Sequence, residues 1–163
     1  MTIRRLAVLA IVATMGACGT SSRTAVSELT VDSAWSRPTP AGATRGVVYL
    51  RVTSPIDDAL VAARVSHKVA HGVNLEDVAG SAGTSPMANM PKMGEDGEMA
   101  IVPLDSVPLL PGVPVVFEPG GKHLILSPLA GPLVAGAHFA ITLWFASGTT
   151  RTVDVVVANN RPS

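Results

Sequence analysis

Four methionines gather in one short stretch of this 163-residue chain, where they could bind a soft metal ion. They are Met87, Met90, Met93 and Met99. The other two methionines of the chain lie within its first 15 residues. A single methionine usually fills a gap in a hydrophobic core, but these four lie among polar, Pro and Gly residues, where a core position is less natural. Thioethers favour Cu(I) and need no deprotonation to bind it, so the cluster predicts a Cu(I) site.

The spacing of the methionines leaves the geometry of such a site open. An extended chain from Met87 to Met93 would span about 20 Å, too far for one ion, so a tight turn must bring them together. A three-residue hairpin loop over residues 95–97 would pair Met93 with Met99. A two-residue turn at residues 96–97 would put these two side chains on opposite faces.

The chain also has four histidines, at positions 67, 71, 123 and 138. A lone histidine at a strand end is more often a structural or surface residue than a metal ligand. Motifs of hydrolytic enzymes are absent from the sequence: it contains neither Gly-x-Ser-x-Gly nor His-Glu-x-x-His. We therefore expect a protein that is not an enzyme.

The N-terminus has the features of an export signal. Two arginines precede an apolar run at residues 6–15, which is too short to span a membrane and is typical of a signal peptide over residues 1–17. Small residues then lead to Cys18, the only cysteine of the chain, as in a bacterial lipobox. We expect lipid attachment at Cys18, a tether over residues 18–28, and an extracytoplasmic protein anchored to the bacterial cell membrane. The alternative is a plain signal peptide cleaved near Ala17.

The remainder of the chain predicts one all-β domain over residues 29–158, followed by a tail at 159–163. Short runs rich in Val, Ile, Leu and Thr alternate with Pro and Gly turns, which favours an antiparallel sandwich or barrel. The expected strands are Leu29–Val31, Gly46–Thr53, Leu60–Ser66, Val69–Val78, Met99–Pro103, Val113–Phe117, His123–Leu126, Ala137–Phe145 and Arg151–Val157.

The charges are balanced, with 12 Lys and Arg against 12 Asp and Glu. Nucleic-acid binding depends on a basic surface, so nucleic acid is not expected as a partner. A single cysteine excludes an internal disulfide framework and a cysteine-based zinc site.

Several motifs together resemble the periplasmic copper chaperones called PCu(A)C. The most specific are Ala-Trp35-Ser-Arg37 and Pro119-Gly-Gly-Lys-His123, and the similarity covers about residues 29–157. The resemblance implies a cupredoxin-like, Greek-key β-sandwich that carries Cu(I) outside the cytoplasm towards the copper centre of cytochrome oxidase.

The family's ligand set, two His and two Met, is only partly matched here. The resemblance places the first His at Glu76 and the first Met at Ile101. It places the second His at His123, which is kept, and the second Met at Ile125. One prediction is a rebuilt Cu(I) site in which His123 is joined by the clustered methionines. The other is a metal-free β-sandwich lipoprotein that acts as a binding or scaffold module.

Overall fold

The computed structural model describes residues 28–78 and 101–162. The predicted lipid-attachment residue and the four predicted methionine ligands lie outside the described residues; these are Cys18, Met87, Met90, Met93 and Met99. Within the described residues, no helix is long and apolar enough to cross a membrane.

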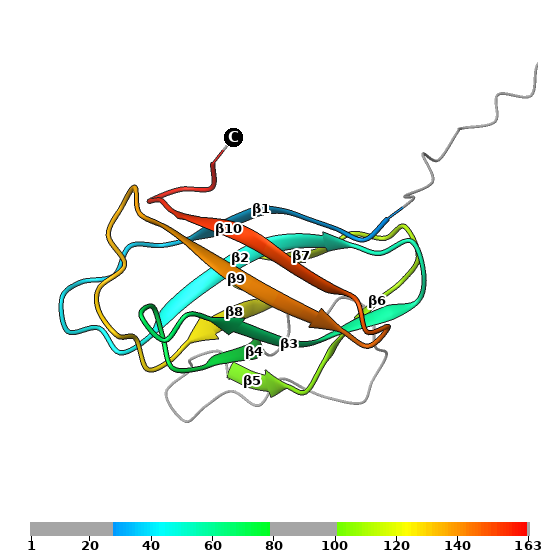
Figure 1. Cartoon of the computed structure of the whole chain (residues 1–163), viewed down its shortest axis with the longest axis horizontal. Helices are drawn as coiled ribbons and strands as arrows, with labels where there is room; N and C mark the ends of the chain where they lie inside the picture. The colour runs from blue at the N-terminus through cyan, green and yellow to red at the C-terminus, as the bar shows by residue number, and fades with distance from the viewer. Residues whose placement is uncertain (1–27, 79–100, 163) are drawn as a thin grey trace, which may run out of the picture.

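Ten strands form the described domain. They are β1 (Thr30–Ser36), β2 (Gly46–Thr53), β3 (Asp58–Val65), β4 (Val73–Val78), β5 (Ile101–Leu104), β6 (Val107–Leu109), β7 (Val115–Phe117), β8 (His123–Leu126), β9 (His138–Phe145) and β10 (Thr150–Val157). They make one sheet in the order β5-β4-β8-β2-β1-β10-β9-β3-β6, with β7 also paired to β2. The sheet folds over so that β2, β4 and β8 lie in one layer and β3, β9 and β10 in the other (Figure 1). This confirms the predicted β-sandwich, although the pairing of β1 with β10 is parallel.

Several predicted strand bounds differ from the observed ones by one or two residues, and three differences are larger. The first strand extends to Ser36 rather than Val31. The fourth begins at Val73, because residues 67–69 form a turn and Gly72 follows it. Strand β6, Val-Pro-Leu, was not predicted, since proline is unfavourable in a strand interior and is tolerated mainly at sheet edges such as this one.

Alternation along β8 divides its side chains between two faces of the sheet. Leu124 and Leu126 belong to the hydrophobic core between the layers, whereas His123 and Ile125 lie on the opposite face. All four side chains are buried. Both layers contribute large, fully buried core residues, among them Val48, Leu50, Leu60, Phe117, Ile141, Leu143 and Val155.

A bulge in β1 sets the direction of Trp35. Val31 packs against the core, and simple alternation would also direct Trp35 into the core. The register between β1 and β2 shifts between Asp32 and Trp35, and Ser33 there has a φ of 54°. The extra residue turns Trp35 to the face that carries His123, where its ring packs against that of Tyr49 with centroids 4.9 Å apart and planes tilted by 40°.

Candidate metal site

His123 is the described residue best suited to bind a metal ion. It opens β8 directly after the turn formed by residues 118–121, and only 8 % of it is exposed. Its Nδ1 lies 2.7 Å from the carbonyl oxygen of Gly121. Because a carbonyl can only accept a hydrogen bond, Nδ1 must donate. In the neutral ring Nε2 therefore keeps its lone pair, as a metal ligand requires.

Glu76 lies directly opposite His123 on the neighbouring strand β4. Its Oε2 is 3.9 Å from His123 Nε2, which is too long for a hydrogen bond. Arg45 instead binds both carboxylate oxygens, with Nη2 at 3.0 Å from Oε1 and 3.3 Å from Oε2. The carboxylate is thus neutralised by a guanidinium, and as a hard oxygen donor it suits Cu(I) poorly.

The two isoleucines at the family's methionine positions supply no ligand atom. Ile125 lies two residues after His123 and on the same face, where it is buried. Ile101 begins the edge strand β5 and is 54 % exposed. Neither side chain has a lone pair, and Glu76 offers only hard oxygen atoms, so His123 is the one residue of these four positions that keeps the ligand type of the family.

The methionine-bearing segment joins the sheet beside these residues. Val78 ends β4, Ile101 begins β5, and the two are paired in register. Residues 79–100 therefore leave and re-enter the sheet at neighbouring positions. Val78 is two residues beyond Glu76 on the same strand, a rise of about 7 Å.

In the part of the chain that the structure describes, no group of three or more His, Cys, Asp or Glu side chains is placed to hold a metal ion.

The structure shows two features that the sequence reasoning missed. One is the Arg45–Glu76 ion pair; a glutamate in the middle of a buried strand was its signal, because a buried carboxylate needs a partner. The other is the closeness of His67 and His71, whose ring centroids lie 5.7 Å apart. The fourth histidine, His138, is exposed and hydrogen-bonded to a β10 aspartate at 2.5 Å.

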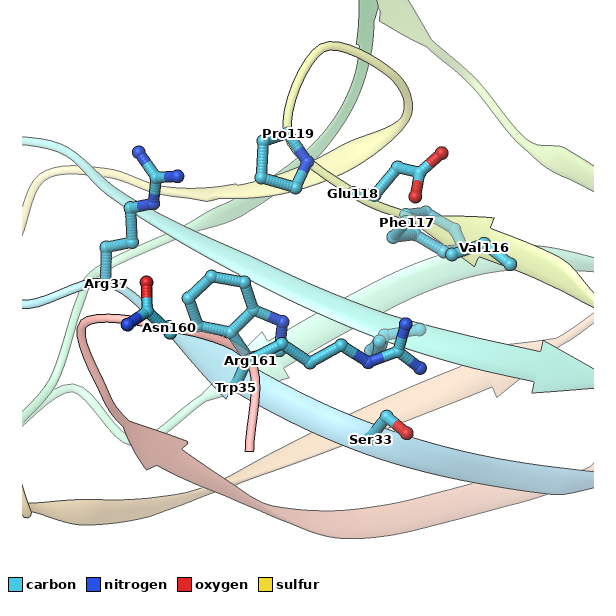
Figure 2. Close-up of a pocket in the computed structure, with 10 residues that line it drawn as sticks. Ser33, Trp35, Arg37, Val116, Phe117, Glu118, Pro119, Asn160 and Arg161 are labelled. Carbon is cyan, nitrogen blue, oxygen red and sulfur yellow. The ribbon is translucent and has the colours of Figure 1, made fainter. Parts of the chain in front are cut away.

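A pocket of about 260 Å³ lies beside the turn that carries the Gly121 carbonyl. Figure 2 shows Trp35 at its centre, with the Arg37 and Arg161 side chains on either side and Pro119 and Glu118 above. None of its lining residues is a histidine, cysteine or methionine, so the pocket offers no soft metal ligand.

Comparison with known proteins identifies the family. A family model described as lipoprotein LpqE-like matches residues 29–157. An uncharacterized protein of Rickettsia prowazekii is 35 % identical over 71 residues, and this chain spans only 39 % of the length of that protein.

Solved structures with the same fold are PCuAC domains. The apo PCuAC domain from PmoF1 is 21 % identical, with a TM-score of 0.59 over 84 % of this chain and 97 % of that one. The copper-bound domain from PmoF2 is 20 % identical, with a TM-score of 0.59 over 83 % and 97 %. The Cu(I) form of DR1885 from Deinococcus radiodurans is 21 % identical, with a TM-score of 0.57 over 88 % and 86 %. The chain therefore belongs to the LpqE-like lipoprotein family, and its β-sandwich has the PCuAC fold.

Proposed function

We propose that this protein is a copper-chaperone-like lipoprotein that binds Cu(I) outside the cytoplasm through His123 and methionine sulfurs. The observation that carries the proposal is the state of His123. Its Nδ1 is bound to the Gly121 carbonyl, so the neutral ring has its lone pair at Nε2, on the face next to the ends of the methionine segment. Copper-bound structures of the same fold support this choice of metal.

In the proposed site, copper is cargo rather than a resident cofactor. The β8 imidazole would supply one ligand, and Met87, Met90, Met93 and Met99 would supply the others. Thioethers are neutral in every step, so an ion can be exchanged with a receiving protein without the release of a proton from these ligands. We propose a copper-receiving oxidase subunit as the receiving protein.

The cellular setting of the proposal follows from the N-terminus and the family. A lipid at Cys18 would hold the domain at the outer surface of the cell membrane. The family description as a lipoprotein supports this placement. Thioether ligands also suit an oxidising compartment better than a free thiol, which oxidises readily.

The test is an anaerobic competition for Cu(I) between the full chain, purified in detergent, and a coloured Cu(I) chelator. We expect one tightly bound ion and a loss of affinity of at least tenfold when the four methionines are replaced by leucine. Leucine keeps the size of the side chain and removes the sulfur. Unchanged affinity would contradict the proposed ligands. Saturating Cu(I) should also raise the melting temperature by selective binding to the native state.

The Arg45–Glu76 ion pair favours a second candidate, a metal-free binding module. A carboxylate bound by arginine next to His123 and an isoleucine at position 125 are features that a lost metal site would show. For this candidate, Cu(I) would bind no more tightly to the wild-type chain than to the leucine variant, and the melting temperature would not shift.

A further inference from the structure

His67 and His71 form a pair of imidazoles on the turn between β3 and β4. Both side chains are exposed, and their ring centroids are 5.7 Å apart with the planes tilted by 50°. Among the described residues, neither ring has a hydrogen-bond partner. The pair is therefore open to an ion from solvent.

The backbone under the pair is fixed before any ion binds. The amides of Val69 and Ala70 both donate to the Ser66 carbonyl, at 2.8 and 3.2 Å, and so close a helical turn. The amide of His71 donates to the Pro128 carbonyl at 2.9 Å. Ala70 is fully buried, which ties the turn to the body of the domain. His71 follows the turn directly, and the 5.7 Å between the ring centroids places the two imidazoles side by side, so only side-chain rotations must be restricted on binding.

The separation of the rings suits one shared metal ion. An ion about 2.0 Å from one nitrogen of each ring would place the ring centroids roughly 4.5–6 Å apart, depending on the angle at the metal. The observed 5.7 Å lies in this range. Imidazole is the ligand of divalent copper, zinc and nickel, and Cu(II) binds most tightly in the Irving–Williams order.

We infer that His67 and His71 bind a divalent transition-metal ion, Cu(II) most tightly, with water in the remaining positions. This site is separate from His123. Five residues separate His71 from Glu76, up to about 17 Å along an extended strand, and the pair lies before the start of β4 whereas residues 79–100 follow its end. The two sites also differ in their ligands, because the two imidazoles of the pair suit Cu(II) whereas the thioethers of the proposed Cu(I) site suit Cu(I). The inference therefore does not depend on the proposed Cu(I) site.

The test is a Cu(II) titration of the full chain in detergent without reductant, followed by electron paramagnetic resonance. We expect two nitrogen ligands in the spectrum. His67→Ala and His71→Ala should each weaken Cu(II) binding at least tenfold, and each should remove one nitrogen from the spectrum. His138→Ala is the matched control, because that histidine is also exposed but is not paired with another histidine. It should leave the affinity unchanged.

Two results would overturn the inference. One is a His67→Ala/His71→Ala double variant that binds Cu(II) as tightly as the His138→Ala control. The other is loss of the two-nitrogen signal when only the four methionines are replaced by leucine, since the ion would then be bound elsewhere. Circular dichroism of each variant checks that the sandwich is intact.

Discussion

The ion pair between Arg45 and Glu76 leads to a quantitative stability prediction. Glu76 is the less exposed partner, with 10 % of its side chain accessible against 55 % for Arg45. Removal of Arg45 and removal of Glu76 should therefore lower the free energy of unfolding by different amounts. Arg45→Ala leaves a buried carboxylate without its guanidinium, whereas Glu76→Gln leaves a guanidinium that water can solvate. We expect Arg45→Ala to lower the free energy of unfolding more than Glu76→Gln does.

The size of the coupling can be derived from the contact. Two unit charges 3.0 Å apart attract by about 5.5 kcal/mol at an effective dielectric constant near 20. Desolvation of Glu76 offsets part of this attraction, and solvent around the half-exposed Arg45 screens more of it. We expect a net coupling free energy of about 1–2 kcal/mol.

A double-mutant cycle measures this coupling directly. The wild type, Arg45→Ala, Glu76→Gln and the double variant are unfolded in urea, with tryptophan fluorescence as the signal. The matched control is a cycle on Arg51 and Asp32, whose contact atoms are 4.0 Å apart and whose side chains are 42 % and 50 % accessible; for this longer pair we expect less than about 0.5 kcal/mol. Equal coupling in the two cycles would refute the argument that burial of Glu76 strengthens its ion pair.

Three further predictions concern the core, the turns and the site. Leu124→Ala should lower the free energy of unfolding in urea by about 2–5 kcal/mol, because the side chain is fully buried; a loss below 1 kcal/mol would speak against its core position. Burial raises the pKa of Asp58, but hydrogen bonds from Ser147 and from the backbone of Ala59 and Ala146 outweigh this and leave the pKa below its usual value. The stability that Asp58 contributes is thus complete above its unfolded pKa, about 3.9, and is lost as pH falls through the lower folded pKa. Asp58→Asn should therefore flatten the decline in urea midpoint below about pH 4, and an unchanged decline would show that Asp58 does not contribute in this way. Finally, Glu76→His with Ile125→Met places a second imidazole and a thioether beside the β8 histidine, and should raise Cu(I) affinity at least tenfold in chelator competition; no gain would show that these positions do not converge on the metal.

Local sequence patterns predict the strands whose alternation is regular. The bounds of Gly46–Thr53 and His123–Leu126 were predicted correctly, because core residues recur at every second position within them. Strand β1 was predicted too short, since its bulge at Ser33 interrupts the alternation. Such a bulge depends on pairing with β2 and leaves little trace in the sequence of β1 alone.

The candidate site was only partly predictable for the same reason. The resemblance aligned Glu76 and His123 with two ligand positions of the family, and the structure places them opposite each other. A glutamate in a buried strand indicates that a partner is needed, but no local pattern identifies that partner as Arg45, 31 residues away. Likewise the hydrogen bond from His123 to the Gly121 carbonyl depends on the shape of the turn at residues 118–121. Contacts between distant segments arise from the tertiary fold rather than from local propensity.

X-ray absorption at the copper edge tests the proposed site most directly. The full chain is loaded anaerobically with one equivalent of Cu(I), and the ligand atoms around the ion are identified and counted. The account predicts one nitrogen ligand together with methionine sulfurs, and loss of the nitrogen in His123→Ala. A coordination shell without sulfur, or one that is identical in wild type and His123→Ala, would contradict it.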